Sequence, residues 1–166
     1  LFADVLLLGA FEIIFSSALS ANQKVLFTKY LLRASGGQGV YAGQWEDVLA
    51  TTQDIESLHR KKSGALFGAA LVLAEISKNV LPEENLENLW KQGENLGLLF
   101  QLIDDCLDVS GTLKDLGKTP KKDEDLNKKT ALSVWGNEET QKRIEKLSQD
   151  LMAYKNWVDF IRERKK

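Results

Sequence analysis

Apolar residues recur at intervals of three and four along nearly the whole chain, which is the spacing of one face of an α-helix. No segment shows the sustained alternation of apolar and polar residues, bounded by hairpin turns, that is typical of β-strands. With 166 residues, of which 43% are hydrophobic and only two are proline, the chain is long enough to bury one core. The sequence therefore predicts a single all-α domain over residues 1–166, built as a helical bundle.

Capping signals and changes of composition divide this pattern into helices. Ser20 followed by Gln23 matches a capping box, and Thr51 with Asp54 offers a similar start. Residues 110–129 are rich in Gly, Asp and Lys, which predicts a mobile polar loop. Helical pattern resumes after this loop, with an amphipathic stretch of two packed helices starting at Asn137. The other expected helices cover residues 1–18, 20–33, 40–50, 51–78 and 83–109.

Charge and cysteine content exclude several classes of protein. The 22 Lys and Arg against 24 Asp and Glu give a net charge of −2, so the chain lacks the basic field of a nucleic-acid-binding domain. Cys106 is the only cysteine, which favours a reducing, cytoplasmic compartment. The most apolar stretch, 5–19, contains Glu12 and is shorter than the roughly 20 residues of a membrane span. We expect it to be a buried helix, and the start at Leu1 within this apolar helix suggests missing upstream sequence.

Three carboxylates gather in the most apolar part of the long helix expected at 83–109. Asp104 and Asp108 are four residues apart and share one face, with Gln101 one turn earlier and Asp105 beside them. Carboxylate oxygens, completed by waters and phosphate oxygens, are what Mg²⁺ prefers. The pattern predicts that Asp104, Asp105 and Asp108 converge on Mg²⁺. The ordinary alternative is a solvated acidic turn at a helix end.

Lysines supply the complementary charge. Lys62 and Ser63 enter a segment that then becomes almost entirely apolar, and Lys118 and Lys128 lie in the polar loop. Each alone is more often a solvated side chain, but together with the acids they favour a diphosphate held between Mg²⁺ and ammonium groups. Asp47 could point into the same cavity and support the metal site by contacting the groups that ligate the metal, without ligating it directly. A packing or surface role is the ordinary interpretation of this segment.

At this point the sequence resembles a family, the trans-isoprenyl diphosphate synthases or polyprenyl synthetases, which include farnesyl and geranylgeranyl diphosphate synthases. The match runs over essentially the whole chain, in the order of the family's motifs, and corresponds to the C-terminal part of the family's domain. The matching segments are Asp4–Glu12 (G-D-A-L-L…A-F-E, with Ala3 for Gly), Gly43–Asp47 (G-Q-x-x-D), His59–Leu66 (H-x-x-K-T-G-A-L, with Ser63 for Thr), Phe100–Asp108 (F-Q-x-x-D-D-x-x-D) and Gly117–Thr130 (G-K…D…K-x-T).

This resemblance implies a fold, a reaction and an assembly. The fold would be an isoprenoid-synthase-like bundle around a central cavity, of which this chain lacks the N-terminal helices. The reaction would be the Mg²⁺-dependent condensation of isopentenyl diphosphate with an allylic diphosphate, giving a longer trans-polyprenyl diphosphate. Family members are usually homodimers, so a homodimer is expected.

The resemblance also implies a role for individual residues. Asp104 and Asp108 would ligate Mg²⁺ that bridges the allylic diphosphate, with Asp105 in support. The catalytic residues would be Lys62 and Lys118, on the diphosphate, and Ser63 and Gln101, near the reacting carbons; Gln44, Phe100 and Lys128 would also bind substrate. Because this chemistry needs no side-chain nucleophile, we expect His59 to be a helix-surface residue and Cys106 to serve packing.

One motif of the family has no counterpart in the chain. This is the first aspartate-rich motif, DDxxD followed by paired arginines, so these residues alone do not complete the family's magnesium cluster. Either the sequence is a fragment of a longer enzyme, or the protein is a non-catalytic or degenerate partner subunit of such a synthase. A helical module that binds divalent ions without a prenyl substrate is the third hypothesis.

Overall fold

The computed structural model describes residues 2–49, 54–78, 82–114 and 129–164, and every regular element in these ranges is helical. The all-α prediction is therefore confirmed. In chain order the elements are α1 (Phe2–Ser16), α2 (Ala21–Ser35), α3 (Val40–Leu49), α4 (Ile55–His59), the π-helix η1 (Arg60–Gly64), α5 (Ala65–Lys78), α6 (Glu83–Lys114), α7 (Ala131–Asp150), the 3₁₀-helix η3 (Met152–Tyr154) and α8 (Lys155–Arg162).

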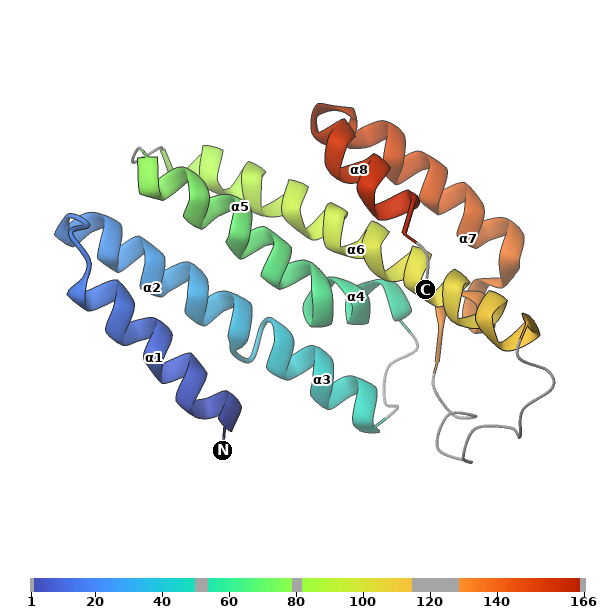
Figure 1. Cartoon of the computed structure of the whole chain (residues 1–166), viewed down its shortest axis with the longest axis horizontal. Coiled ribbons are helices and arrows are strands. Elements are labelled where there is room, and N and C mark those ends of the chain that lie inside the picture. Colours follow the sequence, from blue (N-terminus) through green and yellow to red (C-terminus); the bar gives the residue numbers. More distant parts are fainter. Residues whose placement is uncertain (1, 50–53, 79–81, 115–128, 165–166) are drawn as a thin grey trace.

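The long helix α6 organises the molecule, as Figure 1 shows. Its N-terminal half packs against α5, α2 lies on the other side of α5, and α1 covers the outer side of α2. Its C-terminal half packs against α7 and α8. Two groups of buried side chains follow from this arrangement, one between α2, α5 and α6 around Tyr30 and Trp90, and one between α6, α7 and α8 around Leu99, Leu102 and Leu151.

Glycines bring η1 and α5 into close contact with α6. A Cβ on Gly93 would lie 2.5 Å from the Cα of Gly68, and a Cβ on Gly97 would lie 2.5 Å from the Cα of Gly64. Real Cβ atoms do not approach that closely, so only glycine allows this separation of the two backbones. The close approach sets Ser63, next to Gly64, beside the middle of α6.

Several expected helix boundaries agree with the structure. Ser20 and Gln23 form the capping box of α2, with both reciprocal hydrogen bonds present. The start expected at Thr51 lies outside the described residues, and Asp54 itself caps α4 by accepting a hydrogen bond from the backbone N–H of Ser57. The long helix expected over 51–78 is described from Ile55 and is helical through to Lys78, but it contains the π-helix η1 between α4 and α5.

The region around the expected polar loop also differs. Helix α6 continues to Lys114, into the residues assigned to the loop, and 115–128, with Lys118 and Lys128, lie outside the described residues. Helix α7 begins at Ala131, six residues before the expected start, because Thr130 caps it through Ser133. Gly136, at φ 77°, breaks the helix, so its long regular part does begin at Asn137.

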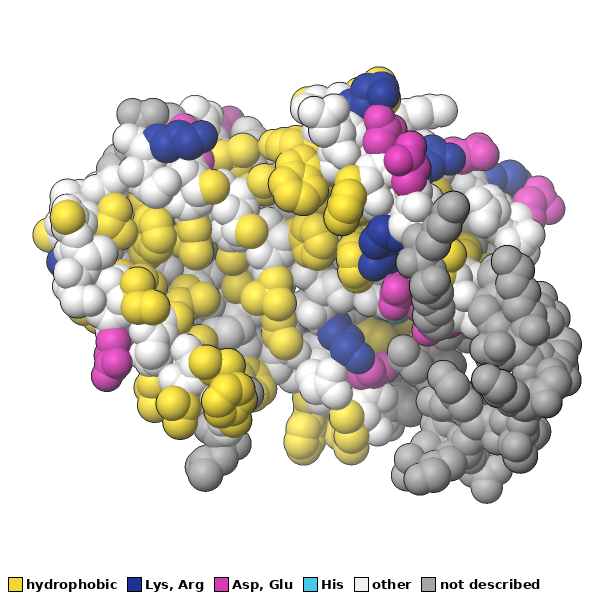
Figure 2. Space-filling view, viewed as in Figure 1, with side chains coloured by type: hydrophobic (Ala, Val, Ile, Leu, Met, Phe, Trp, Pro, Cys, Tyr) yellow, Lys and Arg dark blue, Asp and Glu magenta, His cyan; other side chains and the backbone are white. Residues whose placement is uncertain are grey.

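Helix α1 is not the buried helix that its apolar sequence predicts. Ile14 is 7% exposed, but five other large apolar residues of α1 are more than half exposed: Val5, Leu6, Leu8, Ile13 and Phe15. Figure 2 shows apolar side chains spread over α1 and across the middle of the face it presents. No helix in the described ranges is both long enough and apolar enough to cross a membrane.

Candidate functional site

The π-helix η1 presents Lys62 and Ser63 between α3 and α6. A π-turn adds one residue to the helical repeat and so redirects the side chains it carries. Helix α3 approaches this turn closely, since a Cβ on Gly43 would lie 2.5 Å from the backbone nitrogen of Lys62. Gly43 and Lys62, which belong to two separate motifs of the sequence, are thus adjacent in space.

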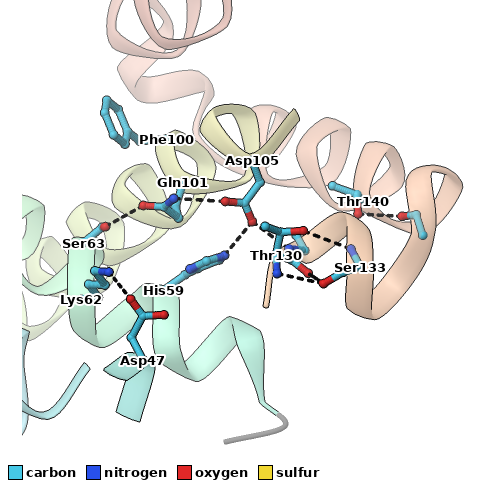
Figure 3. A network of polar contacts seen from close by, with 12 residues as sticks. Asp47, His59, Lys62, Ser63, Phe100, Gln101, Asp105, Thr130, Ser133 and Thr140 are labelled. Atoms are coloured by element: carbon cyan, nitrogen blue, oxygen red, sulfur yellow. Dashed lines mark hydrogen bonds and ion pairs between the residues drawn. The ribbon is translucent and has the colours of Figure 1, made fainter. Parts of the chain in front are cut away.

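Two acids of α3 neutralise two lysines of this turn. Lys61 Nζ lies 2.6 Å from Glu46 Oε1, and Lys62 forms an ion pair with Asp47 (Figure 3). Both partners of the second pair are partly buried, with side chains 30% (Lys62) and 17% (Asp47) exposed. The observed partner of Asp47 is therefore the ammonium group of Lys62. The role expected from sequence, support of a metal site, stays a prediction.

A chain of hydrogen bonds joins η1 to α6, as Figure 3 shows. Ser63 Oγ donates to Gln101 Oε1 over 3.0 Å, and Gln101 Nε2 donates to Asp105 Oδ1 over 3.2 Å. The spacing of four residues between Gln101 and Asp105 makes this second contact possible along one face of α6. Ser63 and Gln101, both expected at the site, are brought together by the fold.

Asp105 is the buried end of this chain, with 1% of its surface exposed. Its Oδ2 accepts from His59 Nε2 over 3.1 Å and from the backbone N–H of Ala131 over 2.7 Å. Burial acts to raise the pKa of Asp105, but the hydrogen bonds from His59, Ala131 and Gln101 and the charge of His59 outweigh it and hold this pKa below its usual value. Asp105 is therefore an ionised carboxylate in the interior.

Two assignments made from sequence change as a result. His59 is not a helix-surface residue, because it is 5% exposed and bonded to Asp105. Asp105 does not converge with the other two acids, because its carboxylate is turned inward toward His59 and Ala131 (Figure 3). The spacing held a signal that was missed: His59 and Ser63 are four residues apart, as are Gln101 and Asp105, so one contact between the two helices implies the other.

Asp104 and Asp108 form the acidic edge of α6. The side chain of Asp104 is 37% exposed and Asp108 is half-buried. No group of three or more His, Cys, Asp or Glu side chains in the described ranges could enclose a metal ion. Two neighbouring carboxylates nevertheless fit Mg²⁺, which is commonly bound by one or two protein carboxylates and completed by waters and substrate phosphates.

Arg164 reaches this edge from the C-terminal segment. Its guanidinium carbon lies 3.7 Å from the centre of the Phe100 ring, and its Nη2 lies 3.5 Å from Asp104 Oδ1. The Phe100 ring in turn packs on Phe67, with 5.6 Å between ring centres. No local signal in the sequence indicates that an arginine of the C-terminal segment returns to a residue 64 positions earlier.

The remaining expected residues are less closely tied to this cluster. Gln44 is exposed on α3, next to Gly43. Lys118 and Lys128 lie outside the described residues, so their roles stay predictions, as does the central cavity. Cys106 packs against the buried group between α6 and α7, and burial, together with the charge of Asp105, raises the pKa of its thiol, which fits the expected packing role.

Comparison with known proteins agrees with the motifs. The polyprenyl synthetase family model matches residues 1–159. Farnesyl diphosphate synthase of Micrococcus luteus is 35% identical over 158 residues, covering 92% of this chain and 54% of that protein. Geranylgeranyl pyrophosphate synthase 4 of Arabidopsis thaliana is 32% identical over 162 residues, covering 93% and 43%. The chain spans about half the length of the curated relatives it matches.

Solved structures show the same fold. A putative farnesyl-diphosphate synthase from Marinomonas sp. MED121 superposes with a TM-score of 0.76 at 23% identity, over 96% of this chain and 60% of that one. The geranyltransferase of Helicobacter pylori, complexed with magnesium and isoprenyl diphosphate, superposes with a TM-score of 0.74 at 24% identity, over 94% and 52%. Sequence motifs, family model and helical architecture thus agree: the chain belongs to the polyprenyl synthetase family.

Proposed function

We propose that this chain is part of a Mg²⁺-dependent prenyltransferase that condenses isopentenyl diphosphate with an allylic diphosphate into a longer trans-polyprenyl diphosphate. The names of the relatives, farnesyl and geranylgeranyl diphosphate synthases, support this reaction. The observation that carries the proposal is the juxtaposition of Lys62 and Ser63 on η1 with Gln101 on α6, one turn from the acidic edge of Asp104 and Asp108.

The proposed reaction breaks one bond and forms another. The C–O bond of the allylic diphosphate breaks, and its electron pair leaves with the diphosphate. The double bond of isopentenyl diphosphate forms a C–C bond to the allylic carbon, and the product then loses a proton, for which the released diphosphate is a suitable acceptor. The barrier is lowered by stabilising negative charge on the leaving group and positive charge on carbon.

Some residues of the chain would stabilise the negative charge of the diphosphate, and others would stabilise the positive charge on carbon. The ammonium of Lys62, held in place by Asp47, would bind a diphosphate oxygen. The hydroxyl of Ser63 and the amide of Gln101 would direct their dipoles toward the reacting carbons. Asp104 and Asp108 would hold Mg²⁺, which would neutralise charge on the diphosphate as it leaves. Homodimer formation and a cytoplasmic location are part of the same proposal.

The decisive test replaces one acid of the edge in the full-length protein. Asp104→Asn should reduce product formation from isopentenyl and allylic diphosphates by about 100-fold or more, since a bound metal contributes several kcal/mol. Glu84→Gln, on the exposed first turn of the same helix, is the matched control and should keep full activity. Full activity in Asp104→Asn would count against the proposal.

A non-catalytic partner subunit is the second candidate, favoured by the absence of the first aspartate-rich motif from these 166 residues. Co-purification with a homologous synthase and recovery of activity on mixing would support it. Calorimetry separates both candidates from a simple divalent-ion module. A prenyltransferase site should bind Mg²⁺ and inorganic diphosphate synergistically, whereas a simple ion site should bind Mg²⁺ equally with and without diphosphate.

A further inference from the structure

The geometry gives the direction of each hydrogen bond in the chain from Ser63 to Asp105. Asp105 Oδ2 accepts from His59 and from the Ala131 N–H, and the NH₂ of Gln101 donates to Asp105 Oδ1 over 3.2 Å. The amide oxygen of Gln101 then faces Ser63, and Ser63 must donate its hydroxyl hydrogen to it. The lone pairs of Ser63 Oγ then remain available to accept hydrogen bonds from neighbouring groups.

The carboxylate of Asp105 is itself fixed from the opposite side. Its Oδ2 accepts from both His59 Nε2 and the Ala131 N–H, while Oδ1 accepts from Gln101. Three elements, α4, α6 and α7, therefore hold one carboxylate that is 1% exposed. Both carboxylate oxygens of Asp105 are thus occupied by protein donors.

We propose that Asp105 is a positioning residue: held by His59 and Ala131, it fixes the amide of Gln101 and thereby the donor direction of Ser63 toward Gln101. This inference rests on the proposed function, because Ser63 and Gln101 matter through their place beside the reacting carbons. It differs from the role expected from sequence, in which Asp105 supported the metal. A positioning residue affects turnover, whereas a metal ligand affects the binding of Mg²⁺.

Asp105→Asn separates the two roles because it changes one contact selectively. The asparagine oxygen can keep the position that accepts from His59 and Ala131, which places its NH₂ against the NH₂ of Gln101. Gln101 relieves this clash by turning its amide over, and its NH₂ then faces Ser63. The hydroxyl of Ser63 must change from donor to acceptor, so the polarity presented beside the reacting carbons is reversed.

The expected result for Asp105→Asn in the full-length protein is a fall of about 10- to 100-fold in kcat, the scale on which small misplacements of catalytic groups act. Binding of Mg²⁺ with inorganic diphosphate, measured by calorimetry, should stay within about twofold of the wild type. Asp104→Asn is the matched comparison and should weaken that binding by about tenfold or more. Wild-type kcat in Asp105→Asn, or a loss of Mg²⁺ binding like that of Asp104→Asn, would overturn the proposal.

A swap of the two polar groups provides the rescue. In the double variant Asp105→Asn with Gln101→Glu, the new carboxylate accepts from both the asparagine NH₂ and the Ser63 hydroxyl, so the original direction at Ser63 returns. We expect kcat at saturating substrate to recover at least about tenfold over Asp105→Asn. Gln101→Glu alone sets two carboxylates against each other and should be worse than the double variant. A double variant no better than Asp105→Asn contradicts the proposal.

The same cycle has a readout that needs neither metal nor substrate. The unfolding midpoints of the wild type, the two single variants and the double variant should be non-additive, with the double variant more stable than the sum of the single losses. Additive losses would overturn the proposed contact. Failure of the proposed function looks different: the wild type would make no prenyl product and bind no Mg²⁺ with diphosphate, while the unfolding cycle stayed non-additive.

Discussion

Asp105 and His59 are two titratable residues whose side chains are only 2% and 6% exposed. Removing one partner of such a buried pair leaves the other without compensation, which costs about 3–5 kcal/mol in comparable cases. His59→Leu should therefore lower the free energy of unfolding by about 3 kcal/mol. His59→Gln is the control, because its NH₂ can replace Nε2 as the donor to Asp105, and it should lose much less. Equal losses in urea titrations would show that the hydrogen bond does not matter.

The lowered pKa of Asp105 also predicts how stability depends on pH. An unfolded aspartate titrates at about 3.9, so the contribution of Asp105 is complete above that pH. It is lost as the pH falls through the lower folded-state value, because protonation then removes the charge that the fold stabilises. In unfolding titrations below about pH 4, the wild type should lose stability more steeply than Asp105→Asn. Parallel curves would contradict this assignment.

The acidic edge illustrates what can be read from sequence at this scale. The spacing of Asp104 and Asp108 places them on one face of any helix, and the structure keeps them there. Whether a polar side chain in such a helix faces outward depends on its neighbours in space. His59 and Asp105 are buried because η1 packs against α6, and the period of either helix alone does not reveal that contact.

The packing of η1 and α5 on α6 depends on four glycines at the contact, Gly64, Gly68, Gly93 and Gly97. Gly93→Ala would place a methyl group 2.5 Å from the Cα of Gly68, and neither backbone can yield cheaply. We expect a loss of about 1–3 kcal/mol in the free energy of unfolding, as for other overpacked cores. Gly9→Ala in α1 is the control: its Cβ would meet nothing within 4 Å, so it should raise helix stability by about 0.5–1 kcal/mol. Similar effects in the two variants would disprove the close contact.

Tyr30 joins α2 to α6 through a hydrogen bond of 3.1 Å to Glu87. Burial, that hydrogen bond and the charge of Glu87 raise the pKa of Tyr30 to about 12. Since the folded-state value exceeds the unfolded value of about 10, this contribution to stability is complete below pH 10 and is lost as the pH rises toward 12. Tyr30→Phe should unfold with a weaker dependence on pH above 10. An unchanged alkaline transition, followed by circular dichroism, would argue against the assignment.

Helix existence was predictable from sequence, but interruptions and ends were less so. The apolar period and the capping box at Ser20 locate α2 correctly. The π-turn of η1 was missed, because one extra residue in a repeat of three and four does not disturb the apolar pattern. The start of α7 was misplaced because the acids after Asn137 are the stronger signal for a first turn, whereas Thr130 and Ser133 form a cap that lacks an acid.

At the scale of the whole molecule, the largest difference from the sequence-based prediction is that apolar side chains expected to be buried, those of α1 above all, are exposed. An apolar helix such as α1 predicts burial on the assumption that a partner covers it, and sequence periodicity does not say where that partner lies. In the part of the chain that the structure describes, α2 covers one side of α1 and its other apolar side chains remain exposed. The curated relatives that the chain matches are about twice as long as this chain.

The C-terminal segment folds back onto the site, and Arg164 is the contact that fastens it. Its stacking on Phe100 should contribute about 1 kcal/mol, while its pairing with the partly exposed Asp104 adds less because solvent screens it. Arg164→Ala should therefore lower the free energy of unfolding by about 1 kcal/mol and increase hydrogen exchange in α8. Arg162→Ala, an exposed residue of the last turn of α8, is the control and should change neither. If both variants exchange alike, the C-terminal segment is held by Val158 and Ile161 in the core alone, and the arginine contributes nothing to its attachment.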